Sequence, residues 1–373
     1  MVWSRWDCIP REGRPCMAFR GTSVSAGLSS RAACYQLRHV LLALGLGLVN
    51  PLQHWQQGVL MVLGVPHAEP HEELELAVED FRDHMTEYEK RLGDLRRYRN
   101  VGHGECLYDL VDTQDIWPTL QKIAEAGFPI IGQYVNIGAH DGFTDDPLYN
   151  YSYNSQALGI AIERDPEQCE RHKANLPDVN VVCSEVTPQN VLPLVRQGLQ
   201  GQDIDVLKID IDSYDCPVLE RIAPKVRATM IMVETNPSIP PPYQWAMLYD
   251  PDLWNFFESF RNPVEVPVRG CSLAYEIQVL RRYGYDLLAF DGHDAIFTHE
   301  SVRRAFHPHQ LPVDEFDCYA HSLIVANGIP INLTRQWFFK ESDVHKTLPE
   351  IWRFFVDWMA ANSPILFPFA LRV

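Results

Sequence analysis

The feature that most constrains the fold is a regular alternation of short apolar runs and helical stretches between residues 130 and 300. The apolar runs lie at 133–137, 157–162, 180–183, 205–210 and 229–234. Strands that are apolar almost throughout are typical of a parallel sheet that helices cover on both faces. A further helix at 272–283 precedes two runs at 285–290 and 295–298, and the turn Asp291-Gly292 between them predicts an antiparallel hairpin at the end of the sheet.

Polar residues and glycines follow these strands, where a parallel sheet binds its ligand. Gly138 and Gly142 let the backbone approach a ligand closely. Glu163 ends the second strand, 21 residues beyond Gly142, and its carboxylate can accept both hydrogen bonds of a ribose diol. The layout predicts a nucleoside site whose cofactor-binding residues are Asn136, Gly138, His140, Asp141, Gly142, Glu163, Ser184, Glu185 and Asp210.

The charge around the glycine turn favours one kind of nucleoside. A dinucleotide needs a glycine-rich turn that places its pyrophosphate on a helix N-terminus, but Asp141, Asp145 and Asp146 stand there and would repel phosphate. A cationic nucleoside without phosphate fits better, and S-adenosylmethionine is the common one. Ser184 and Glu185 are expected to flank its adenine or simply to end the third strand.

Three segments together resemble one enzyme family. The segments are Val135-Asn136-Ile137-Gly138-Ala139-His140-Asp141-Gly142, Ile162-Glu163, and Leu207-Lys208-Ile209-Asp210-Ile211-Asp212-Ser213-Tyr214-Asp215. They resemble the glycine loop, ribose clamp and strand-four block of FkbM-type S-adenosylmethionine-dependent methyltransferases, over about residues 130 to 300. The resemblance implies a Rossmann-like, seven-stranded class I methyltransferase sheet with an antiparallel last strand, and O-methylation of a small molecule or glycan. Asn136, Asp212 and Ser213 depart from the family, which has an acid, Glu and Gly there.

Methyl transfer to oxygen requires in-line positioning and removal of the hydroxyl proton. The candidate catalytic bases are Asp212 first, His140 second, and His293 or Asp294 third. Asp212 has the alternative role of capping the next helix, and His140 that of supporting its loop. No metal ion is expected at the site.

Two other functions are compatible with the same residues. Asp210 and Asp212 form a D-x-D pair after a strand, the arrangement with which many glycosyltransferases hold a divalent metal and a nucleotide sugar. Because Asn136 replaces an acid of the family, a non-catalytic scaffold that binds the cofactor is the third hypothesis.

The chain before residue 100 has a different composition. Residues 1–67 are rich in arginine and contain the apolar stretch 37–65, which is too interrupted to span a bilayer. The segment predicts a targeting or membrane-contacting role, with a helical pair packed on the catalytic domain as the alternative. Residues 70–99 predict a helix whose apolar seam from 74 to 95 favours either a homodimeric coil or packing on its own domain. An organellar or membrane-associated location is therefore expected over a cytosolic one. Together these segments form an N-terminal helical arm.

The remaining expectations concern the other domain boundaries, the partners and the cysteines. The methyltransferase domain spans 100–300, and residues 301–373 form an aromatic C-terminal extension. Its amphipathic helix at 349–360 is expected to pack on the core, with a cap over the substrate cleft or a partner surface as the alternative. A net charge of −17 excludes nucleic acid as a partner. The nine scattered cysteines predict free thiols in a reducing compartment, without structural zinc or disulfides. For that reason the glycosylation motifs at Asn150 and Asn332 are expected to be unused.

Overall fold

The computed structural model describes residues 104–107, 110–199, 201, 203–259, 266–322, 331–340 and 343–373. The predicted targeting or membrane-contacting segment and the predicted heptad helix lie outside these residues. None of the described helices combines the length and the apolar character that crossing a membrane requires.

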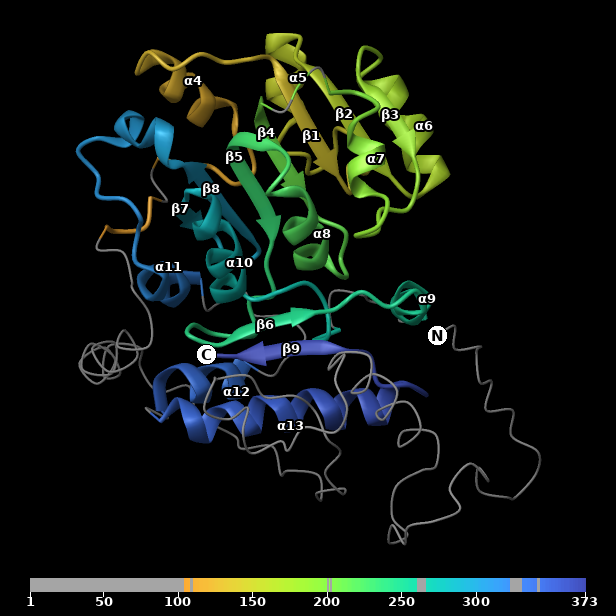
Figure 1. Ribbon diagram of the computed structural model, residues 1–373, viewed down its shortest axis with the longest axis vertical. Helices are drawn as coiled ribbons and strands as arrows, with labels where there is room; N and C mark the ends of the chain where they lie inside the picture. The colour runs from red at the N-terminus through yellow and green to blue at the C-terminus, as the bar shows by residue number, and fades with distance from the viewer. Residues whose placement is uncertain are drawn as a thin grey trace, which may run out of the picture.

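A seven-stranded sheet in the order β3-β2-β1-β4-β5-β8-β7 forms the centre of the molecule (Figure 1). Strands β1 to β5 are mutually parallel, and β8 runs antiparallel to both β5 and β7. The strands are β1 (Gln133–Ile137), β2 (Leu158–Glu163), β3 (Asn180–Cys183), β4 (Asp203–Ile209), β5 (Arg227–Glu234), β7 (Tyr285–Phe290) and β8 (Asp294–His299). The predicted parallel sheet and terminal hairpin are confirmed.

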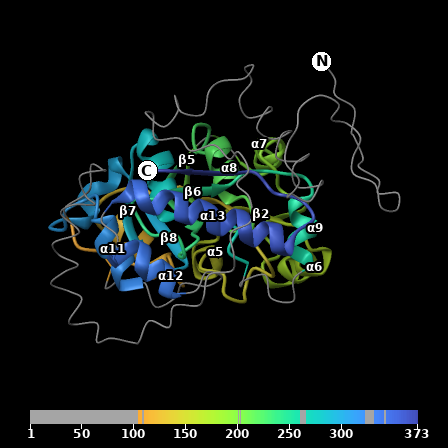
Figure 2. The same ribbon diagram turned by 90° about the horizontal axis from the view of Figure 1, so that it is seen from below.

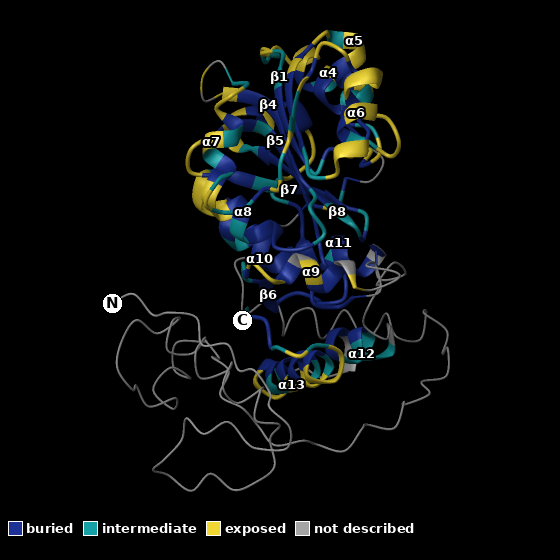
Figure 3. Cartoon of the chain, turned by 90° about the vertical axis from the view of Figure 1, so that its right-hand side faces the viewer, coloured by how far each residue is buried: buried dark blue, intermediate teal, exposed yellow. Residues whose placement is uncertain are grey.

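Helices cover both faces of this sheet, which explains why its strands are apolar on both sides. Figure 3 shows α4, α5 and α6 on one face and α7, α8 and α10 on the other, with their exposed residues turned outward. The bounds are α4 (Trp117–Glu125), α5 (Tyr149–Ser155), α6 (Pro166–Asn175), α7 (Val191–Val195), α8 (Asp215–Ile222) and α10 (Leu273–Leu280), which a 3₁₀ turn (Arg281–Tyr283) extends.

Local signals set several helix starts. Asp165 caps α6 by accepting hydrogen bonds from the backbone N–H groups of Glu167 and Gln168, with Pro166 as the first helical residue. Ser272 caps α10 through the N–H of Tyr275.

A second layer lies against the end of the sheet and is built largely from the C-terminal residues (Figures 1 and 2). Strand β6 (Gln244–Met247) pairs antiparallel with β9 (Phe369–Arg372). The other elements here and beside the sheet are α9 (Leu253–Glu258), a 3₁₀ helix (Glu300–Phe306), α11 (Glu315–Ser322), α12 (Ile331–Arg335), a π-helical turn (Gln336–Lys340) and α13 (Val344–Asn362). Buried residues of this layer and of the sheet form one continuous core.

Helix α13 buries the aromatic stripe that was expected to pack on the core, including Trp352 and Phe355. It begins earlier than predicted, because Asp343 caps it through the N–H of His345. Pro349 therefore lies inside the helix instead of opening it. Proline is a helix-start signal only where no stronger cap precedes it.

The prediction of free thiols is wrong for six cysteines. Disulfides join Cys106 to Cys318, Cys169 to Cys183, and Cys216 to Cys271. The paired cysteines lie 212, 14 and 55 residues apart in the chain. These separations match no short cysteine spacing that would have predicted the disulfides from the sequence.

Candidate functional site

A cavity of about 480 Å³ opens at the carboxyl ends of the parallel strands. Seven of the residues predicted to form the site line it: Gly138, His140, Glu163, Ser184, Glu185, Asp210 and Asp212. The other five, Asn136, Asp141, Gly142, His293 and Asp294, do not line it. The topology thus brings together the residues that follow four different strands.

Gly138 forms the close backbone turn after β1. Its φ of +76° lies in the left-handed region, and its N–H donates to the carbonyl of Ile162 at 2.9 Å. A Cβ at this position would stand 1.5 Å from the carbonyl oxygen of Asp210. The turns after β1 and β4 therefore touch backbone to backbone, which only glycine permits.

The Glu163 carboxylate organises two loops of the cavity. One oxygen accepts the N–H of His140 at 2.9 Å, and the other accepts the N–H groups of Arg164 and Asp165, both at 2.7 Å. Each carboxylate oxygen has two lone-pair sites, so acceptor capacity remains for a ligand hydroxyl. Glu163 therefore fixes the glycine turn against the β2–α6 turn while it faces the cavity.

Three of the predicted residues lie around the glycine turn without lining the cavity: Asn136, Asp141 and Gly142. Asn136 is 1% exposed, and its amide nitrogen lies 3.2 Å from an Asp146 carboxylate oxygen. Burial acts to raise the pKa of Asp141, but hydrogen bonds from the Thr144 N–H and hydroxyl and from the Phe143 N–H lower it overall. A Cβ on Gly142 would meet the His172 ring at 2.4 Å.

Backbone strain gathers at the cavity. Among the described residues other than glycine, four have a positive φ: His140, Asp145, Gln156 and Asp212. Three of them, all but Gln156, line the cavity. A left-handed conformation costs such residues about 1 kcal/mol or more, and it persists where the surroundings require it.

A buried lysine neutralises the first carboxylate of the D-x-D pair. Lys208 places its Nζ 2.8 Å from an Asp210 oxygen. Burial would lower the pKa of Lys208, but Asp210 and Asp146 hold it above its usual value. Burial acts to raise the pKa of Asp210, but the charge and hydrogen bond of Lys208, together with the charges of His293 and Arg269, lower it overall.

Asp212 has a different environment. Burial, and then the neighbouring Asp210, raise its pKa, while Arg269 opposes the shift. The guanidinium NH1 of Arg269 lies 2.7 Å from Oδ1 of Asp212 and 3.2 Å from Oε1 of Glu234. Asp212 does not cap α8, whose N-cap residue is Tyr214.

The two third-rank base candidates lie near Glu234. His293 places Nδ1 3.9 Å from Oε1 of Glu234. Asp294 ends the hairpin turn, and burial, then Asp210, raise its pKa to about 8.

Sequence reasoning missed Lys208, Glu234 and Arg269 as parts of the site. A lysine inside an otherwise apolar strand was a usable signal for Lys208, because buried lysines are rare unless paired. Arg269 lies in a loop 57 residues beyond Asp212, and no motif marks it.

Divalent-cation ligands are also present. Asp210, Asp212 and Glu234 each offer a ligand atom within 4.8 Å of the others. Lys208 and Arg269 already supply positive charge to this cluster. The expectation that no metal binds stays a prediction.

Several solved structures are similar to this chain. A TehB-like SAM-dependent methyltransferase from Corynebacterium glutamicum is 14% identical over 58% of this chain and 99% of its own, with a TM-score of 0.28. An O-methyltransferase from Bacillus cereus in complex with SAH is 14% identical over 60% and 91%, with a TM-score of 0.27. An S-adenosylmethionine-dependent methyltransferase from Mesorhizobium loti is 13% identical over 49% and 97%, with a TM-score of 0.31. No family model and no curated protein sequence matches the chain.

The strand order defines the fold. Seven strands with only β8 antiparallel, and a cavity at the carboxyl ends of the parallel strands, form the Rossmann-like class I methyltransferase fold, as predicted.

Proposed function

We propose that the protein is an S-adenosylmethionine-dependent methyltransferase of the FkbM type that methylates a hydroxyl oxygen of a small molecule or glycan. The observation that carries the proposal is the acidic cavity around the Gly138 turn. Two cationic side chains, Arg164 and Lys208, line it against seven carboxylates: Asp145, Asp146, Glu163, Asp165, Glu185, Asp210 and Asp212. Such a cavity favours a cationic ligand and disfavours a pyrophosphate.

The residues present fit this cofactor. Glu163 would accept one ribose hydroxyl at the acceptor site that its three backbone hydrogen bonds leave, Ser184 and Glu185 would flank the adenine, and Asp210 with the Gly138 turn would hold the remaining polar part. When bound, the cofactor supplies an electrophilic methyl group. Tyr214 holds the adenine side in place, because its hydroxyl donates to the Val186 carbonyl at 2.9 Å and lies 3.2 Å from a Glu185 oxygen.

Asp212 is the general base in this proposal. A base works best when its pKa approaches the working pH, and burial beside Asp210 shifts the pKa of Asp212 in that direction. Arg269 orients the carboxylate through Oδ1 and prevents it from rotating out of line with the acceptor hydroxyl.

An exposed aromatic cluster begins at Phe143, which follows the glycine turn and precedes the cavity-lining Thr144, and extends away from the cavity onto α5; in this proposal a glycan or another ring-shaped acceptor stacks on it. Phe143 follows the glycine turn and is 57% exposed, and Tyr153 on α5 is 66% exposed. Tyr149 stacks on Tyr153 with ring centroids 5.8 Å apart and meets Phe143 edge-on at 4.9 Å. Contiguous exposed apolar surface of this kind typically marks a binding site.

Calorimetric titration with S-adenosylmethionine, S-adenosylhomocysteine, NAD and a UDP-sugar tests the proposal. The first two should bind, and Glu163→Gln should weaken their binding by about 1 to 3 kcal/mol, because the amide loses charge-assisted acceptor capacity. Glu167→Gln is the matched control, since the Glu167 side chain pairs with Arg171 on the exposed surface of α6. Equal affinity in both variants would remove Glu163 from the site.

Two outcomes would favour the other hypotheses. Binding of a UDP-sugar that requires Mn²⁺, without binding of S-adenosylmethionine, would point to a glycosyltransferase that uses Asp210 and Asp212. Cofactor binding without turnover across a library of hydroxyl acceptors would point to the non-catalytic scaffold.

A further inference from the structure

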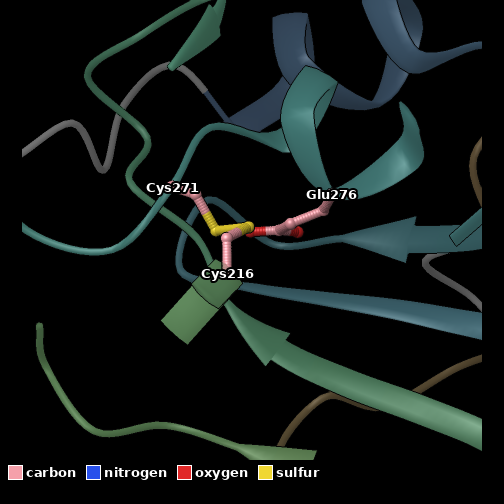
Figure 4. Close-up of side chains that lie close together, drawn as sticks. All are labelled: Cys216, Cys271 and Glu276. Carbon is pink, nitrogen blue, oxygen red and sulfur yellow. A yellow bond between two sulfur atoms is a disulfide. The ribbon is translucent and has the colours of Figure 1, made fainter. Parts of the chain in front are cut away.

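The disulfides change what can be inferred about where this chain folds. A disulfide joins Cys216 on α8 to Cys271 before α10 (Figure 4). Their Cα atoms are 5.9 Å apart, and both residues are fully buried. Cys106 and Cys318 have Cα atoms 5.1 Å apart and join the segment before α4 to α11. Both separations fit an undistorted disulfide. Structural disulfides between distant segments are typical of oxidising compartments and rare in the cytosol.

An oxidising secretory compartment would also make the two Asn-x-Ser/Thr motifs potential acceptors of N-linked glycans. The structure distinguishes them. Asn150 is exposed on α5, whereas Asn332 is half-buried. The hydroxyl residues of both motifs are buried, Ser152 at 6% and Thr334 at 0% exposed, so the two motifs differ in the exposure of the asparagine.

The surroundings of Asn150 tolerate a glycan. Its amide nitrogen donates to an Asp115 carboxylate oxygen at 2.8 Å, in an exposed contact. An N-linked amide keeps one N–H, so this hydrogen bond can survive the modification. Ser152, the third residue of the motif, accepts a hydrogen bond from the Tyr134 hydroxyl at 3.0 Å inside the fold. The buried residue of the motif is thus Ser152, whereas the residue that would carry the glycan is Asn150.

We propose that the chain folds in an oxidising compartment of a secretory pathway and carries an N-linked glycan on Asn150. The inference is independent of the proposed methyl transfer. It agrees with the targeting or membrane-contacting segment expected within residues 1–67, and it replaces the reducing compartment expected from the cysteine spacing.

The full chain, expressed in eukaryotic cells with its own N-terminus, is treated with a peptide N-glycosidase and analysed by gel mobility. The wild type should shift, and Asn150→Gln should abolish the shift. Asn154→Gln is the matched control, because Asn154 lies exposed on the same helix and has Gln156, not Ser or Thr, two residues later. Asn332→Gln should also keep the shift.

Two measurements on the wild type need no substitution. Mass spectrometry of the peptide that contains Asn150 should find a glycan, and its absence would overturn the modification. Alkylation of the denatured protein before reduction should leave the six paired cysteines unlabelled, and alkylation after reduction should label them. Labelling of Cys216 or Cys271 in the denatured protein before reduction would overturn the proposed compartment.

Discussion

Gly138→Ala should damage stability and cofactor binding together, and the structure sets the size of the effect. The new Cβ would stand 1.5 Å from the Asp210 carbonyl oxygen, whereas nonbonded heavy atoms pack at about 3.5 Å, so one of the two turns must move by about 2 Å. The backbone at Asp210 resists, because its N–H donates to the Ile137 carbonyl at 3.0 Å.

Two penalties add for this substitution. Alanine at a φ of +76° costs about 1 to 2 kcal/mol. Overpacking costs about 1 to 3 kcal/mol more. The expected loss of unfolding free energy is therefore about 2 to 5 kcal/mol. The displaced Asp210 turn should weaken S-adenosylhomocysteine binding at least tenfold, which is about 1.4 kcal/mol.

Gly127→Ala separates the two penalties. Gly127 has a φ of +87°, but a Cβ there would meet nothing within 4 Å. Urea unfolding should therefore show only the conformational penalty for this control, and calorimetry should show unchanged affinity. If Gly138→Ala behaved like Gly127→Ala in both assays, the inferred contact between the two turns would be wrong.

Three further predictions follow from the site and the core. Asp212→Asn should lower kcat about 10² to 10⁴-fold with less than a tenfold change in cofactor affinity. Wild-type kcat should fall as the pH drops through the raised pKa of Asp212, because the base must be ionised. A wild-type rate that does not change with pH would contradict this role. Asp294 has a folded-state pKa of about 8 against 3.8 in its reference state, so its contribution to stability is present below about pH 4 and is lost as the pH rises towards 8. The stability of Asp294→Asn relative to wild type should therefore increase with pH by at most about 1.4 kcal/mol per pH unit. A stability difference that stays constant with pH in urea unfolding would refute the shift. Replacing Cys216 and Cys271 together by alanine should lower the free energy of unfolding by about 4 kcal/mol, because the disulfide no longer closes the loop between them. Reducing this bond should destabilise the wild type, whereas the double variant has no such bond to lose. Equal stability of the two proteins before reduction would count against the pairing.

The sequence predicted the central sheet well because strand identity there is a local property. Five apolar runs matched the five parallel strands to within about two residues at each end, as is usual for strong patterns. The glycine turn and Glu163 were also readable, because the position after a strand fixes a residue at the carboxyl edge of the sheet.

The rest of the site depended on long-range contacts that leave no local pattern. Arg269 reaches Asp212 from a loop, and Glu234 ends a strand whose sequence reads simply as apolar. Asn136 shows the opposite error, because this residue within the right motif is buried against Asp146 and does not itself line the cavity. Disulfide pairing likewise required the spatial arrangement, since the cysteine spacings were uninformative.

The pairing of β6 with β9 has a consequence for biosynthesis. Trp245 on β6 is fully buried and stacks on Phe355 of α13, with Phe369 of β9 also in ring contact. Residue 245 is synthesised more than one hundred residues before those partners. The Trp245 side chain therefore stays exposed, or bound by a chaperone, until the nascent chain has grown far enough to supply them. The central sheet can assemble during translation, but the layer beneath it closes only after the final strand has emerged.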